Sequence, residues 1–319
     1  MKPRSYRSVI AAGFRLYTEN FRRLLKASWL LAAVYAVCNS AAGALAAIKI
    51  PEVALWFAEQ ASAPEGADSF DQTASSYLLL LLAICLLTAV SMLALLIAHS
   101  AVISKLREHY ATAAISIPAR WTAIDRKSLW RTLKGGLATA ACILLPLVLL
   151  MGVTLAAEHF SSQPMASHAT TLTAVLIVIN LIVAVGSLPL FYHLMKYLMD
   201  DSQRFWPSLA ADYARGLRHI SLLFVVFLLS TLLTGLAMLV ITLPASILQM
   251  AHMTAQAGLL IGDQLGMPAY MGVLTFVTFA LCSFMGFYVS LPIIFHNYFA
   301  FGAIETKEQI RQQQKQDLQ

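Results

Sequence analysis

Charged residues are scarce in this sequence of 319 residues. Asp, Glu, Lys and Arg make up 12% of the chain and hydrophobic residues 59%, whereas a soluble globular domain carries about 25% charged residues. A soluble protein has no place for so much apolar surface because its exterior must be hydrated, but a lipid bilayer accepts it. The composition excludes an ordinary soluble domain and predicts an all-α, polytopic transmembrane bundle.

Cysteine is also rare, and the four present lie singly inside apolar runs. None forms a Cys-x-x-Cys pair or joins a ligand cluster, so we interpret all four as small packing residues. The sequence also lacks a phosphate-binding loop, a Gly-x-Ser-x-Gly elbow and a His-Glu-x-x-His zinc motif. We therefore expect no cofactor and favour a non-enzymatic protein.

Ionisable residues are missing from the centre of every long apolar run. Intramembrane Asp, Glu, Lys and Arg mark proton relays and ion-coupled transport. Their absence argues against a proton- or sodium-driven transporter and leaves open a passive or lipid-handling path.

Six apolar runs are long enough to cross a bilayer, which takes about 20 helical residues. They cover residues 27–48, 77–98, 135–156, 170–193, 219–247 and 268–300. In the first run, Ala32, Ala36, Ser40 and Ala44 recur every four residues on one helical face. A face of small residues predicts the close approach of another helix.

Lys and Arg are confined to one set of connections. Seven lie in the first 26 residues, seven between the second and third spans, four between the fourth and fifth, and three in the tail, which leaves only Lys49 elsewhere. By the positive-inside rule, both termini face the cytoplasm, and we expect a bacterial inner-membrane protein. The net charge of +6 thereby reflects membrane orientation rather than nucleic-acid binding.

A short motif occurs twice, as Ser187-Leu-Pro189 followed by His193 and as Ser290-Leu-Pro292 followed by His296. A basic amphipathic stretch also precedes each odd span. We predict one transmembrane domain over residues 1–304, built from three helical hairpins (1–110, 111–204 and 205–304), each preceded by an amphipathic cytoplasmic helix, and a polar cytoplasmic tail over 305–319. Chance recurrence in a Leu-rich chain is the alternative.

The prolines of this motif each free a backbone carbonyl one turn earlier. Ser187 and Ser290 are close enough to help satisfy the groups freed by Pro189 and Pro292. The functional interpretation is a pair of kinks that line a cavity or hinge. The alternative is the plain packing of bent helices.

Three histidines, His99, His193 and His296, close the even spans. If repeat symmetry brings them together, three imidazoles suit zinc and two suit a haem. The alternative places each ring at a helix C-terminus, facing lipid headgroups, where the helix dipole favours the cation. The sequence shows no carboxylate beside them, which favours the alternative.

Each odd span is also preceded by an apolar residue followed by Arg. The three pairs are Phe21-Arg22, Trp130-Arg131 and Leu217-Arg218. We predict that these Arg form a basic collar at the cytoplasmic headgroups, where anionic lipid contributes about 1 kcal/mol per cation. Plain membrane anchoring is the alternative.

The stretch that begins at Ser187 reads SLPLFYHLMKYLMDDSQRFWPSLAADYARGLRHISLLF. It resembles the membrane domain of glycerophosphoryl diester phosphodiesterase-like proteins and related six-helix bacterial inner-membrane proteins. In that group, a span with a proline leads through an acidic turn to an amphipathic helix and the next span. Pro189, Asp200-Asp201, Trp206-Pro207-Ser208 and Arg218 stand in those places. The soluble phosphodiesterase domain of some members has no counterpart here, so the resemblance transfers no catalytic residue.

These observations predict an integral inner-membrane protein that supports transport or membrane and envelope homeostasis. The expected partners are the lipid bilayer, anionic headgroups, and a cytoplasmic or membrane protein. The competing hypothesis is a membrane-embedded enzyme, or a metal- or haem-binding protein, that uses His99, His193 and His296.

Overall fold

The computed structural model describes residues 5–62, 70–112, 126–160, 169–260, 267–268 and 270–317. Eight helices account for nearly all of these residues. They are α1 (Tyr6–Ser62), α2 (Phe70–Thr112), α3 (Arg126–Phe160), α4 (Ala169–Met199), α5 (Phe205–Arg218), α6 (Ile220–Leu260), α7 (Tyr270–Ser290) and α8 (Pro292–Gln316).

Six stretches of these helices are long and apolar enough to cross a membrane, which confirms the predicted six-span helical protein. The sixth stretch comprises α7 and α8, which meet at Leu291, directly before Pro292. Large apolar side chains cover the outer surface, and Leu78, Ile182 and Ile247 are each more than 60% exposed. Such a surface requires lipid around it.

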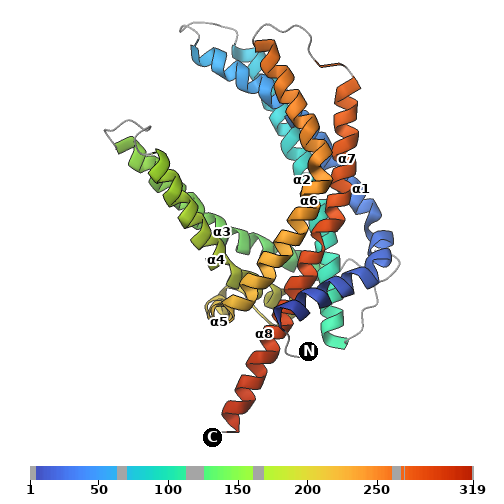
Figure 1. Cartoon of the computed structure of the whole chain (residues 1–319), viewed down its shortest axis with the longest axis vertical. Helices are drawn as coiled ribbons and strands as arrows, with labels where there is room; N and C mark the ends of the chain where they lie inside the picture. The colour runs from blue at the N-terminus through green and yellow to red at the C-terminus, as the bar shows by residue number, and fades with distance from the viewer. Residues whose placement is uncertain are drawn as a thin grey trace.

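The six spans pack as three hairpins, α1 with α2, α3 with α4, and α6 with α7. The first and third hairpins also join each other, through α1 and α7. The α3–α4 hairpin leaves this group and diverges from it toward the far end (Figure 1). The three hairpins therefore share one end of the molecule, which we call the base.

The packing of α1 depends on its small residues. Ala32, Ala36, Ser40 and Ala44 are all buried. A Cβ at the neighbouring Gly43 would lie 2.9 Å from the ring of Phe279 in α7. The structure thus confirms the close helix approach predicted from this face.

The amphipathic stretches take different forms. One forms the separate helix α5, whereas the first is continuous with the membrane span of α1 and lies across the base before α1 turns upward (Figure 1). The remaining stretch, which precedes the third span, falls largely on residues 113–125, which lie outside the described residues.

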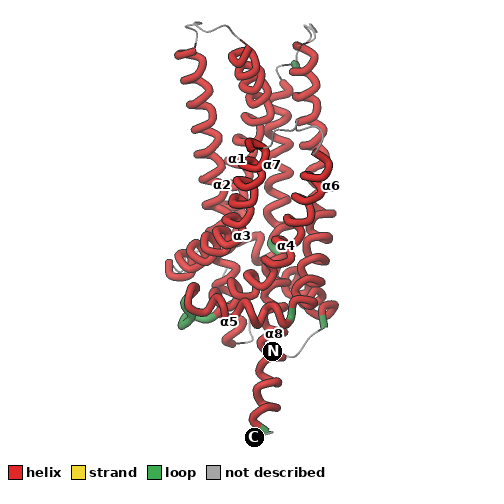
Figure 2. The backbone as a smooth tube through the Cα atoms, turned by 90° about the vertical axis from the view of Figure 1, so that its left-hand side faces the viewer, coloured by secondary structure: helices red, strands yellow, loops and turns green. Residues whose placement is uncertain are grey.

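The base also contains the first part of α8 and the described N-terminal end of the chain, whereas the rest of α8 projects beyond it (Figures 1 and 2). Its aromatic core includes Tyr192, Phe287, Phe295 and Tyr298, each 2% exposed or less. The helix α8 extends into the predicted polar tail, to Gln316. The base is therefore the most completely packed part of the protein.

Candidate functional site

The centre of the base is the carboxylate of Asp212 in α5, which is 1% exposed. Its Oδ2 accepts hydrogen bonds from Nδ1 of His193 at 3.0 Å and Nε2 of Gln203 at 2.9 Å. Its Oδ1 accepts from Nζ of Lys196 at 2.7 Å and lies 3.5 Å from a guanidinium nitrogen of Arg215. The buried charge is thus surrounded by donors from α4, α5 and their connection.

These donors set the ionisation of Asp212. Burial alone raises the pKa of the carboxyl, but the hydrogen bonds from His193 and Lys196 and the charge of Lys196 outweigh it, so the pKa lies below its ordinary value. Asp212 is therefore an anion at neutral pH. A buried anion with several hydrogen bonds fixes the position of α5 against α4.

The helix α5 brings Asp212 inward because of its residue spacing. Phe205, Leu209, Asp212 and Gly216 recur at intervals of three and four residues, so they share one helical face. A Cβ on Gly216 would lie 2.8 Å from Cβ of Pro189, so only glycine permits this contact between α5 and α4. Sequence reasoning missed the role of Asp212, although its place on an apolar face was a usable signal.

Two arginines bind the carbonyl end of α4. Arg107 of α2 donates to the carbonyl of Leu198 at 3.0 and 2.7 Å. Arg131 of α3 donates to the carbonyls of Tyr197 and of Asp200, the latter at 2.7 Å. The last carbonyls of a helix have no partner within the helix and carry partial negative charge. The two cations therefore cap α4 and join it to α2 and α3.

Asp201, the second residue after α4, completes this junction. It pairs with Arg107 at 2.9 Å, with Lys127 at 3.2 Å and with Arg131 at 3.7 Å. Although burial raises the pKa of Asp201, the hydrogen bond from Lys127 and the charges of Arg107, Lys127 and Arg131 lower it below its ordinary value. The acidic turn is thereby held by cations from α2 and α3.

The three predicted headgroup arginines do not form one collar. Arg131 is wrong for that role, because its side chain is only 12% exposed and its guanidinium is occupied by α4 carbonyls and Asp201. Arg218 is half-exposed and lies 3.8 Å from Glu308. Arg22 is exposed and has no polar partner within the described residues. Of the three, only Arg22 keeps its charge available for a headgroup.

The histidines have separate surroundings. His193 is fully buried against Asp212 and Phe205. His296, also fully buried, is hydrogen-bonded to Ser230 at 2.8 Å. His99 is half-buried in α2. In the part of the chain that the structure describes, no three His, Cys, Asp or Glu residues are grouped to hold a metal ion.

The predicted placement of His193 and His296 at helix ends, facing headgroups, is wrong. The helix α4 continues for six residues beyond His193, and α8 continues far beyond His296. His193 also has the carboxylate neighbour that the sequence did not reveal, because Asp212 lies 19 residues away across the α4–α5 turn.

The two Ser-Leu-Pro motifs make matching hydrogen bonds. Ser187 donates to the carbonyl of Ala184 at 2.7 Å, and Ser290 donates to that of Phe287 at 2.8 Å. The carbonyls that the prolines free are those of Val185 and Tyr288, four residues before each proline. Each serine therefore donates to the carbonyl one residue before the freed group, rather than to the freed group as expected. Pro189 lies within the continuous helix α4, whereas Pro292 begins α8.

Each motif is also contacted by a tyrosine from an amphipathic segment. Tyr213 of α5 donates to the carbonyl of Gly186 at 2.9 Å, three residues before Pro189. Tyr17 of α1 donates at 3.0 Å to the carbonyl of Tyr288, four residues before Pro292. The Tyr288 carbonyl is the group that Pro292 leaves without its helical donor. The amphipathic segments thus stabilise the backbone at both prolines.

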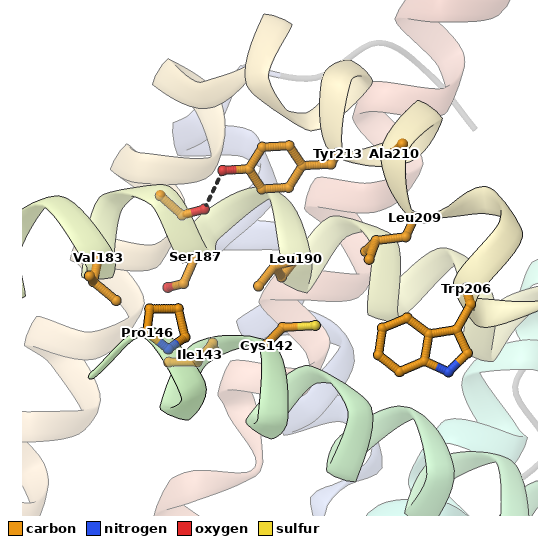
Figure 3. Close-up of a pocket in the computed structure, with 11 residues that line it drawn as sticks. Cys142, Ile143, Pro146, Val183, Ser187, Leu190, Trp206, Leu209, Ala210 and Tyr213 are labelled. Carbon is orange, nitrogen blue, oxygen red and sulfur yellow. Dashed lines mark hydrogen bonds between the residues drawn. The ribbon is translucent and has the colours of Figure 1, made fainter. Parts of the chain in front are cut away.

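An apolar cavity of about 540 Å³ lies beside the first motif, between α3, α4 and α5 (Figure 3). Cys142, Ile143 and Pro146 of α3, Val183, Gly186, Ser187 and Leu190 of α4, and Trp206, Leu209, Ala210 and Tyr213 of α5 line it. The hydroxyls of Ser187 and Tyr213 already donate to backbone carbonyls. Of the two predicted kink residues, Ser187 therefore lies in the cavity wall, and Pro189 lies beside the cavity. A second cavity lies between α1 and α7.

The fold and the site define a multi-pass integral membrane protein whose helices meet in a buried polar base. No family model, curated protein or solved structure matches the chain.

Proposed function

We propose that this protein is a non-enzymatic protein of the bacterial inner membrane that supports membrane and envelope homeostasis by holding phospholipid chains. The observation that carries this proposal is the apolar cavity between α3, α4 and α5. Its volume of about 540 Å³ falls within the range of about 300–1,000 Å³ that small-molecule sites occupy.

The walls of this cavity suit a hydrocarbon chain. Its serine and tyrosine hydroxyls are already hydrogen-bonded, so a polar occupant gains little there. Trp206 lines the cavity and is 64% exposed. Tryptophan favours the depth at which hydrocarbon meets water. A phospholipid chain in the cavity with its headgroup near Trp206 satisfies both observations.

The surroundings of the buried polar groups argue against catalysis. A general acid or base must come within hydrogen-bond reach of its substrate. His193 and Asp212 are sealed in the base and bind each other. Ion-coupled transport is also disfavoured, because the ionisable network lies at the base rather than along the spans.

The orientation of the protein in the membrane and its family resemblance are parts of the same proposal. Lys and Arg gather in the segments that form the base, so we assign the base and both termini to the cytoplasm. The resemblance to phosphodiesterase-like membrane domains fits a lipid-related role. A cytoplasmic or membrane protein partner remains a prediction.

The proposal is tested by filling the cavity. Ala210 is exposed and lines the cavity, so Ala210→Trp places a large ring inside it. The matched control is Ala211→Trp, at an exposed neighbouring position that does not line the cavity. We expect Ala210→Trp, but not Ala211→Trp, to lower the phospholipid that co-purifies with each protein molecule.

The same two variants are then expressed in a deletion strain grown with a membrane-perturbing detergent. We expect Ala211→Trp to restore growth and Ala210→Trp to fail. Unchanged lipid content and full growth with a correctly inserted Ala210→Trp protein would contradict the proposed function.

A further inference from the structure

The second cavity, of about 550 Å³, is a groove between the first part of α1 and the last part of α7. The α1 wall is formed by Tyr17, Thr18, Phe21 and Leu25, and the α7 wall by Phe284, Met285, Tyr288 and Val289. Phe21 and Met285 remain 37% and 53% exposed. The groove is therefore apolar and open on the outer surface of a membrane protein.

The polar atoms of this groove are already paired. The hydroxyl of Tyr17 donates to the Tyr288 carbonyl at 3.0 Å, and that of Thr18 donates to the Phe14 carbonyl at 2.9 Å. The hydroxyl of Tyr288 is hydrogen-bonded to Ser28 at 3.2 Å. Because each of these hydroxyls already has a partner, a polar ligand gains little there, whereas a hydrocarbon chain needs no hydrogen bond.

The guanidinium cation of Arg22 lies beside this groove. Thr18, Phe21, Arg22 and Leu25 follow the i, i+3, i+4, i+7 spacing, so Arg22 shares the helical face that lines the groove. Trp29, four residues after Leu25, lies on the same face and is 57% exposed. Among the described residues, Arg107 and Arg131 bind carbonyls at the end of α4, whereas Arg22 is exposed and has no polar partner.

We propose that the α1–α7 groove binds an anionic phospholipid, with one acyl chain in the groove and its phosphate on Arg22. The charge of Arg22 selects the anionic headgroup, and Trp29 favours the interfacial depth. This site extends the lipid-handling function proposed above, but it rests on other residues, so either proposal can fail alone.

The test uses the full chain in phosphatidylcholine vesicles that contain a photoactivatable lipid with a reactive group in its acyl chain. The probe is either phosphatidylglycerol, which is anionic, or phosphatidylcholine, which is zwitterionic. Labelling is quantified by mass spectrometry on the α7 peptide that contains Met285. We expect the anionic probe to label this peptide about fivefold more, which corresponds to about 1 kcal/mol for one cation near an anionic lipid.

Arg22→Gln should remove this preference. Arg23→Gln, at an exposed position that faces away from the groove, is the matched control and should keep it. Equal labelling by the two probes in the unaltered protein, or the same loss in both variants, would overturn the proposal by showing that headgroup choice does not depend on Arg22.

Met285→Trp fills the groove from an exposed position. We expect it to abolish labelling of α7 by both probes, and persistent labelling would place the lipid outside the groove and overturn the site. Ala210→Trp should leave α7 labelling intact. If Ala210→Trp loses co-purified lipid but Arg22→Gln keeps the preference for the anionic probe, this inference is rejected and the proposed function is retained.

Discussion

Asp212 illustrates how one side chain can fix several elements. Its carboxylate binds His193 and Lys196 of α4 and Gln203 of the connection. Lys196 also approaches Glu305 of α8 at 3.9 Å, and Glu305 accepts a hydrogen bond from Tyr192 at 2.5 Å. The charge network therefore links α5, α4 and α8 through groups that have little contact with solvent.

Asp212→Ala should destabilise the protein by about 3–5 kcal/mol, because it leaves Lys196, whose side chain is only 14% exposed, without its principal anion. Thermal unfolding in detergent measures the effect. Asp317→Ala removes an exposed carboxylate at the chain end and should change stability by less than about 0.5 kcal/mol. Equal stability of the two variants would show that Asp212 does not hold the base together.

The contribution of Asp212 should also depend on pH. Its pKa in the folded protein lies below its ordinary value, so its stabilising effect is fully present above the unfolded pKa of about 3.9 and is lost as the pH falls through the folded value. We expect the stability gap between the unaltered protein and Asp212→Ala to hold from pH 5 to about pH 4 and to narrow below that. Unfolding curves across this range check the sign.

At the scale of elements, α5 is held against α4 through a glycine. Gly216→Ala should force the two helices apart and cost about 1–3 kcal/mol, because the new Cβ would lie 2.8–2.9 Å from Cβ and Cα of Pro189. A Cβ at Gly136 of α3 would meet no atom within 4 Å. Gly136→Ala should therefore stabilise the protein by up to about 1 kcal/mol, through helix propensity.

Hydrogen exchange of α5 provides the measurement for this pair. Faster exchange across α5 in Gly216→Ala, with unchanged exchange in Gly136→Ala, is the expected result. If Gly216→Ala behaves like Gly136→Ala, the α4–α5 contact has room that the structure does not show.

The sequence anticipated the elements better than their contacts. The spacing of Ala32, Ala36 and Ser40 depends on one helix alone, so it could be read directly and proved correct. The binding of Asp212 to His193 depends on the reversal of the chain between α4 and α5, which periodicity does not encode. The occupied guanidinium of Arg131 was missed for the same reason.

The internal repeat remains a prediction at this scale. Ser187 and Ser290, and likewise Tyr213 and Tyr17, make comparable hydrogen bonds at the two prolines. The histidines differ, because His193 binds a carboxylate and His296 a hydroxyl. A diverged repeat accounts for a shared backbone arrangement with unlike side-chain partners.

At the scale of the whole molecule, the prediction concerns orientation. Single cysteines are introduced into a variant that lacks the four native ones and are labelled in intact cells with an impermeant reagent. Positions Gly66, Ser162 and Gln264, which lie outside the described residues, should react, and Gln313 should not. Ser128, which also lies between the second and third spans, is 1% exposed and is therefore unsuitable for labelling. Exposed Arg126 replaces it.

Labelling at Arg126 or Gln313 in intact cells would reverse the assigned orientation. Both positions should react once the cells are permeabilised, which controls for accessibility. The number of spans needed no tertiary information, because hydropathy and length determine it. The divergence of the α3–α4 hairpin depends on where side chains are buried, and hydropathy does not report that.

That divergence has a mechanical consequence. The described buried residues of α3 lie between Ser128 and Thr139, and those of α4 begin at Ser187, so the packing that the structure describes for this hairpin lies at the base. The stretch from Ala169 to Pro189 extends about 30 Å at about 1.5 Å per residue. A rotation of about 8° at Pro189 would move the far end by about 4 Å. A displacement of the far end of the hairpin would therefore be transmitted along α4 to His193 and Lys196, which bind Asp212 at the base.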